Sequence, residues 1–108
     1  MNLNDLELSV TQWAHDRNLI KGTTPDKQFI KLVEEIGEVA ACLAKDQRHK
    51  LKLEMGDMLV VLIILAEQNN MTINECLLET WHKIKDRKGM MVDGFFIKEQ
   101  DLPPMGHM

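Results

Sequence analysis

Five acidic side chains in two short clusters are the residues of this sequence best suited to chemistry. Glu34, Glu35 and Glu38 form a Glu-Glu-x-x-Glu cluster, and Glu54 and Asp57 form a Glu-x-x-Asp cluster. At helical spacing the first three lie within about 100° of arc on one side of a helix, and the other two share a face. One turn further on, each of these faces becomes apolar. Carboxylates in such surroundings need a partner, so they are not expected to be ordinary surface charge.

The chemistry that these carboxylates predict is the binding of a hard divalent cation. If the two helices pack antiparallel about a hinge near residues 45–48, the two clusters face each other at similar depth. Converging carboxylates repel one another, and all-oxygen ligands favour Mg²⁺, with Mn²⁺ as a possible substitute. Their number allows two or more ions together with substrate phosphates. A di-iron site built on Glu79-x-x-His82 is disfavoured because such sites use two Glu-x-x-His pairs and the sequence holds one.

Four helical segments are predicted to position these side chains. They cover about residues 3–18, 25–45, 47–69 and 73–88, and Thr24 and Thr72 are predicted to cap the second and fourth. The third segment is rich in β-branched residues at its centre, which leaves a buried strand as a competitor, but its length favours a helix. Asp93-Gly94 between two apolar runs predicts a small hairpin. The expected fold is all-α, an antiparallel four-helix bundle-like domain over residues 1–98, with a short C-terminal hairpin and a flexible tail at 99–108.

The apolar surface of the second helix follows a 3–4 spacing and forms one stripe, made of Phe29, Leu32, Val33, Ile36, Ala40 and Leu43. The third helix is apolar on more than one face. A lone chain of 108 residues has little interior in which to cover both helices. We therefore expect an oligomer, either a homodimer or a homotetramer.

Composition excludes several classes of function. A formal net charge of −4 argues against duplex nucleic acid as a partner, although a metal ion can invert the sign of an acidic pocket. The longest apolar run, Met58 to Ala66, is too short to span a bilayer. The N-terminus has no signal-peptide pattern, and Cys42 and Cys76 lack metal-type spacing and are expected to be buried free thiols. These features predict a cytoplasmic protein.

The acidic clusters and their neighbours resemble a known family. Gln28-Phe29-x-Lys31-Leu32-x-Glu34-Glu35-x-Gly37-Glu38, followed by Glu54-x-Gly56-Asp57 and Val60-Val61-Leu62, is similar to the MazG-like nucleotide pyrophosphohydrolases. The resemblance covers about Trp13 to Gly89. It implies an all-α fold that oligomerises and a Mg²⁺-dependent hydrolysis of nucleoside triphosphates to nucleoside monophosphate and pyrophosphate.

The resemblance also implies roles for individual residues. Glu35, Glu38, Glu54 and Asp57 would be metal ligands, and Glu34 would be an outer ligand or would orient the attacking water, so that Glu34, Glu35 and Glu38 form the catalytic group. These roles suit phosphoryl transfer, which needs charge neutralisation and an aligned nucleophile.

Four further residues are predicted to bind the nucleotide. Lys83 and Arg87 match a basic element of the family and would contact phosphate, although cations also favour a helix C-terminus for structural reasons. Trp13 and Arg17 could stack on a base and contact phosphate, whereas an indole on an apolar stripe is more often part of a core. Relatives often carry an Asn near Lys83, where this chain has Trp81 and His82.

Two narrower or different functions stay open at this point. The first is a hydrolase selective for dCTP or dUTP, since no short motif encodes base or sugar selectivity. The second is a catalytically idle helical protein-interaction module that uses the apolar third helix. The presence of all five acidic positions argues against the idle module.

Overall fold

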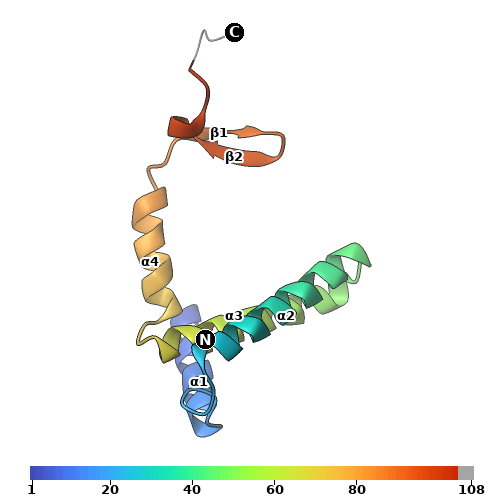
Figure 1. The fold of residues 1–108 in the computed structure, drawn as a ribbon, viewed down its shortest axis with the longest axis vertical. Helices are drawn as coiled ribbons and strands as arrows, with labels where there is room; N and C mark the ends of the chain where they lie inside the picture. Colours follow the sequence, from blue (N-terminus) through green and yellow to red (C-terminus); the bar gives the residue numbers. More distant parts are fainter. Residues whose placement is uncertain (105–108) are drawn as a thin grey trace. The chain divides into compact units, whose positions relative to one another are not determined.

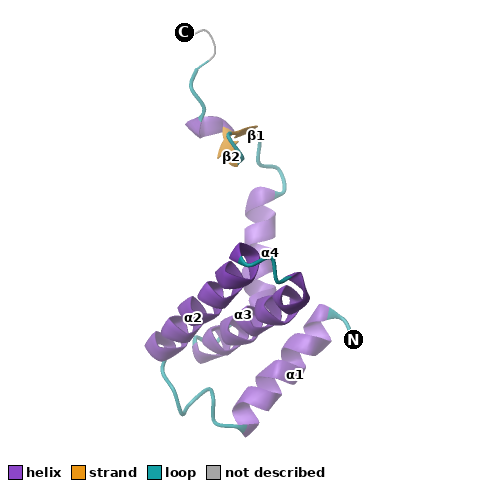
Figure 2. Ribbon diagram, turned by 90° about the vertical axis from the view of Figure 1, so that its right-hand side faces the viewer, coloured by secondary structure: helices purple, strands orange, loops and turns teal. Residues whose placement is uncertain are grey.

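The computed structural model describes residues 1–104, which form four helices and a two-stranded hairpin. The chain divides into two compact units, residues 1–76 and residues 77–108. Helix α4 (Ile73–Ile84) begins in the first unit and continues into the second. Figures 1 and 2 show the elements in chain order. Among the described residues, no helix combines the length with the apolarity that a membrane crossing requires.

Helix α1 (Leu3–Asp16) is fixed at its start by a reciprocal cap and at its end by burial. The Asn2 side chain accepts a hydrogen bond from the Asp5 backbone N–H, and the Asp5 carboxylate accepts one from Asn2. Near its other end, Ala14 is fully buried and forms a small core with Ile20 and with Ile64 of the third helix, which are buried almost completely. This small core attaches α1 to the rest of the first unit.

Helices α2 (Pro25–Ala44) and α3 (Arg48–Gln68) lie side by side as a helical hairpin (Figure 1). Thr24 caps α2 by accepting a hydrogen bond from the Lys27 N–H, and Pro25 occupies the first turn. A three-residue connection reverses the chain, with Asp46 in the left-handed region at φ 53°. These findings confirm the predicted second and third helices, and they exclude the strand alternative for the third.

The apolar stripe of α2 is mostly exposed. Of its large side chains only Leu32 is buried, whereas Phe29 is 58% and Leu43 is 63% exposed. The side of α2 that packs on α3 is the flank that carries Leu32, Glu35 and Cys42. Helical periodicity identifies an apolar face but not the element that covers it, because that depends on how the connecting loop orients the hairpin.

The start of α4 combines a predicted cap with one that the sequence did not indicate. Thr72 accepts a hydrogen bond from the Glu75 N–H, as the capping motif predicts. In addition, the buried carboxylate of Glu7 accepts hydrogen bonds from the N–H groups of Ile73, at 2.6 Å, and Asn74, at 3.1 Å. These are orphan donors of the helix N-terminus, where a negative charge is favoured.

The second unit ends differently from the prediction. Helix α4 stops at Ile84 and not near Lys88, because the chain tightens into a turn in which the Arg87 N–H bonds to the Ile84 carbonyl. Strands β1 (Gly89–Val92) and β2 (Phe95–Lys98) then form the predicted antiparallel hairpin. Asp93 and Gly94 both have positive φ, as a two-residue type I′ turn requires.

The predicted C-terminal tail is partly ordered. Glu99–Asp101 form a short 3₁₀ helix, η1, and the Glu99 N–H bonds to the Lys88 carbonyl. Residues 105–108 of the predicted tail lie outside the described part of the chain. Four helices and a hairpin are thus confirmed, and the packing of all four helices as a bundle stays a prediction. Both cysteines are free in the structure, with Cys42 buried and Cys76 only half-buried.

Candidate metal site and nucleotide groove

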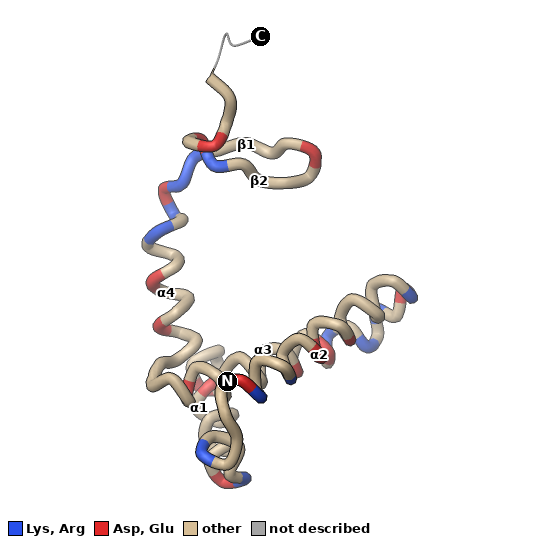
Figure 3. The backbone as a smooth tube through the Cα atoms, viewed as in Figure 1, with Lys and Arg blue, Asp and Glu red and all other residues tan. Residues whose placement is uncertain are grey.

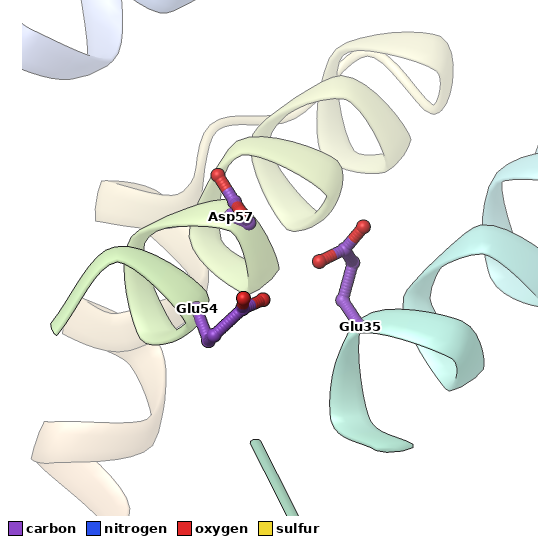
Figure 4. Close-up of side chains that lie close together, drawn as sticks. All are labelled: Glu35, Glu54 and Asp57. Carbon is purple, nitrogen blue, oxygen red and sulfur yellow. The ribbon is translucent and has the colours of Figure 1, made fainter. Parts of the chain in front are cut away.

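Three carboxylates from two helices converge in the first unit. Glu35 of α2 faces Glu54 and Asp57 of α3, and one carboxylate oxygen from each lies within 4.8 Å of the others (Figure 4). Glu35 and Glu54 are half-buried, whereas Asp57 is exposed. The antiparallel hairpin explains the meeting, since Glu35 lies eleven residues before Asp46 and Asp57 eleven residues after it.

Glu38 lies beside this acidic cluster and not within it. Its charge is close enough to act on Glu54, yet its carboxylate is outside the group of three converging oxygens. The sequence predicts that Glu35 and Glu38 both face Glu54 and Asp57, and the structure brings Glu35 into the converging group. Its assignment as a further metal ligand stays a prediction.

Crowding of like charges is visible in the pKa of Glu54. Partial removal from water and then the charges of Asp57, Glu38 and Glu35 raise this pKa above its usual range, and Lys50 only partly opposes them. A carboxylate cluster that is costly to ionise binds a cation favourably, because the cation cancels the repulsion.

Lys31 is a neighbour of the cluster that the sequence analysis did not single out. Its Nζ lies 3.4 Å from Glu35 Oε1 and 3.5 Å from Glu34 Oε2. The hydrogen bond to Glu35 and the two carboxylate charges raise the pKa of Lys31. Its position three and four residues before two adjacent glutamates was the available signal, since these are the spacings at which helical side chains meet.

A groove of about 480 Å³ adjoins the cluster, a volume typical of small-ligand sites. Its charged and polar lining is Lys27, Gln28, Lys31, Glu34, Glu35 and Asp57. Its apolar lining is Trp13, Leu19, Ile30, Val60, Val61 and Ile64. The groove therefore joins an apolar wall to an edge that carries both acidic and basic side chains.

Trp13 occupies the apolar wall, as a base-stacking role would require. The guanidinium of Arg17 lies over its ring at 4.9 Å from the centroid and donates a hydrogen bond to the Trp13 carbonyl. Arg17 does not itself line the groove. The structure thus places Trp13 in the lining of the same groove as Glu35 and Asp57, with Arg17 against the Trp13 ring and outside the lining.

Lys83 and Arg87 lie in the second unit. Together with His82, Lys88 and Lys98 they line a polar hollow of about 730 Å³. Figure 3 shows Lys and Arg gathered where α4 ends and the hairpin begins. Asp86, Glu99 and Gln100 line the same hollow, so its charge is mixed. The action of Lys83 and Arg87 on a substrate bound to the carboxylates stays a prediction.

The donor set suits Mg²⁺ or Mn²⁺. All three converging ligands are hard carboxylate oxygens, without the thiolate or imidazole that zinc prefers. Oxygens that share one Mg²⁺ are at most about 4.2 Å apart, so small side-chain rotations bring separations of up to 4.8 Å into range. Glu35, Glu54 and Asp57 thus fit a divalent cation of this class.

Comparison with known proteins decides the family. A family model described as the MazG nucleotide pyrophosphohydrolase domain matches residues 23–92. This chain belongs to the MazG family. The MazG match includes all five predicted carboxylates as well as Lys31, Lys83 and Arg87, whereas Trp13 and Arg17 precede it.

One curated relative is similar to this chain. The chain is 48% identical over 69 residues to an uncharacterized 18.2 kDa protein from the rep-hol intergenic region of Haemophilus phage HP1. The aligned segment spans 64% of this chain but only 42% of the phage protein. No solved structure matches the chain.

Proposed function

We propose that this MazG-family protein is a Mg²⁺-dependent nucleoside triphosphate pyrophosphohydrolase, which converts an NTP or dNTP and water to the monophosphate and pyrophosphate. The observation that carries the proposal is the convergence of Glu35, Glu54 and Asp57 at the edge of a groove with an apolar wall. Such a groove matches the two halves of a nucleotide, an apolar base and a polyanion that needs a cation.

The roles proposed for the carboxylates follow from the acidic cluster and from the groove beside it. Glu35, Glu54 and Asp57, joined by Glu38, would hold the cation. When bound, Mg²⁺ would neutralise phosphate charge and lower the pKa of a coordinated water. Glu34 lines the same groove and could accept a proton from the attacking water or orient it.

The rest of the groove would bind the substrate. Trp13 would offer its ring to the base, and Arg17, which lies over that ring, would hold the indole in place or contact phosphate. Lys83 and Arg87 do not line this groove, and their proposed contacts with phosphate oxygens, by charge-assisted hydrogen bonds, rest on the basic element of the family alone. We further propose that the protein acts on its nucleotide substrate in the cytoplasm and that it assembles as a homodimer or homotetramer.

A second candidate is a catalytically idle protein-interaction module. The exposed apolar side chains of α2 favour it, since exposed apolar patches mark interaction sites. The two candidates differ in whether the acidic cluster is used.

The experiment that separates them is a panel of the common NTPs and dNTPs with Mg²⁺ and then Mn²⁺. The hydrolase is expected to turn over at least one of them, with dCTP and dUTP as the selective alternatives. Asp57→Asn should reduce that turnover at least 100-fold, because it removes a charged ligand from the cluster. Absence of turnover with every nucleotide and both metals would favour the idle module.

A further inference from the structure

The sole cation paired with the acidic cluster in the described part of the chain is Lys31. Its Nζ contacts Glu35 at 3.4 Å, and Glu35 is one of the three converging carboxylates. The two partners differ in exposure, since the Glu35 side chain is 12% exposed and that of Lys31 is 52% exposed. Glu35 therefore depends on a counter-charge, whereas Lys31 can move into solvent or toward a ligand.

We infer that Lys31 is an exchangeable counter-ion of the metal site, an inference that rests on the proposed function. Without metal, Lys31 neutralises Glu35. When Glu35 binds a divalent cation, Lys31 leaves this carboxylate and donates hydrogen bonds to a phosphate oxygen in the same groove. Lys31 is thus a positioning residue for Glu35 in one state and a phosphate-binding residue in the other.

Simple electrostatics makes the two states exclusive. A divalent cation within about 2.1 Å of a Glu35 oxygen would place its charge close to an ammonium 3.4 Å from that carboxylate, and like charges repel at such range. The Lys31 side chain has a free path, because it also lines the groove that would hold the phosphates. Lysine suits this exchange, since it is a compact charge on a flexible stem.

The exchange couples two ligands through one side chain. Lys31 competes with the cation for Glu35, so it weakens binding of metal alone. It also adds a positive charge for phosphate once metal is bound. By linkage, bound metal then raises the affinity for phosphate, and bound phosphate raises the affinity for metal. Removal of Lys31 should reduce this mutual increase in affinity.

The test measures the affinity for each ligand in Lys31→Met. Binding of Mn²⁺ alone, followed by electron paramagnetic resonance of the free ion, is expected to be about threefold to tenfold tighter in the variant, and less so at high salt. Binding of inorganic pyrophosphate at saturating Mg²⁺, followed by calorimetry, is expected to be about threefold to tenfold weaker. Lys31→Arg should stay within about twofold of wild type for Mn²⁺, because it keeps the charge.

Lys27→Met is the matched control for Mn²⁺. Lys27 lines the same groove one turn earlier and makes no ion pair within residues 1–104, so its removal should change the Mn²⁺ affinity less than about twofold. A merely structural role of Lys31 would weaken both ligands together, and that result would overturn the inference.

Failure of the inference differs from failure of the proposed function. If wild type binds Mn²⁺ through Asp57, as loss of binding in Asp57→Asn would show, an unchanged affinity in Lys31→Met overturns the role of Lys31 alone. If wild type binds no Mn²⁺, or if Asp57→Asn binds Mn²⁺ with the affinity of wild type, the proposed metal site and the proposed exchange of Lys31 are both wrong. If pyrophosphate binds equally to wild type and Lys31→Met, the phosphate-binding state is wrong.

Discussion

At the scale of single residues, the site is built from charges that oppose folding until a ligand arrives. Glu54 is half-buried beside Asp57 and close to Glu38 and Glu35, and its pKa is raised for that reason. Such arrangements are common at functional sites, where groups are held in unfavourable surroundings for the sake of activity. Two consequences at this scale can be measured.

The first prediction concerns the stability of the metal-free protein. A carboxyl whose folded pKa is raised stabilises the fold when protonated, and this contribution is lost as pH rises from the unfolded pKa through the folded one. Glu54→Gln, which is always neutral, should therefore raise Tm at pH 7 in EDTA. The difference should shrink as pH falls through the folded pKa and vanish well below the unfolded pKa, where Glu54 is protonated in both states. A lower Tm for Glu54→Gln at pH 7 would contradict the charge crowding.

The second prediction concerns Glu38, which lies beside the converging carboxylates. Glu38→Gln should reduce turnover at least about 100-fold, because it removes a charge from the metal site. The circular dichroism spectrum should stay unchanged. Glu79→Gln is the control, since Glu79 lies on α4 in the second unit and outside the predicted hydrolase site. Near-wild-type activity of Glu38→Gln would show that Glu38 is not a ligand.

The sequence predicted much of the site because its carboxylates occur at helical spacing on two adjacent helices. The convergence of Glu35 with Glu54 and Asp57 follows from that spacing and a short hairpin connection. The partnership of Lys31 was missed, although its spacing to Glu34 and Glu35 was visible. Whether Glu35 or Glu38 enters the centre depends on the rotation of α2 about its axis, which a motif does not encode.

At the scale of elements, the first unit depends on a contact between its two ends. Glu7 of α1 accepts two backbone hydrogen bonds from the first turn of α4, so one buried carboxylate fixes where that helix begins. Local motifs such as the Thr72 cap could be predicted because all their atoms lie within four residues. The role of Glu7 could not, because 66 residues separate it from Ile73.

The third prediction tests this contact. Glu7→Gln keeps one acceptor oxygen and loses the charge, so it should reduce the free energy of unfolding by about 1–3 kcal/mol in urea titrations. Hydrogen exchange should quicken at the amides of Ile73 and Asn74. Asp5→Asn is a useful comparison, because Asp5 is an exposed capping residue and its loss should cost less. An unchanged hydrogen-exchange rate of the Ile73 amide in Glu7→Gln would contradict the role of Glu7 at the start of α4.

At the scale of the whole molecule, the main feature is apolar surface that the first unit does not itself cover. The stripe of α2 remains exposed at Phe29, Val33, Ile36 and Leu43, and no large side chain of the described residues is fully buried. Exposed stripes of this kind are typical of chains that associate. Amphipathic periodicity revealed the stripe, but the sequence of one chain does not show whether a second copy covers it. The oligomer therefore remains a prediction.

The fourth prediction is that the stripe holds two copies together. Wild type should elute as a homodimer or homotetramer in size-exclusion chromatography with light scattering. Ile36→Glu should shift it toward the monomer, because the substitution places a charge in a desolvated interface. Lys45→Glu, at the C-terminal cap of α2, is the control and should leave the assembly intact. A monomeric wild type would contradict the assembly.

The central claim is the hydrolysis of a nucleoside triphosphate between its α- and β-phosphates by the carboxylates that meet between α2 and α3. The most direct measurement is ³¹P nuclear magnetic resonance of a nucleotide from the panel during incubation with the protein and Mg²⁺. We predict the resonances of a nucleoside monophosphate and pyrophosphate in equal amounts, absent with Asp57→Asn. Release of orthophosphate with a nucleoside diphosphate would contradict the account.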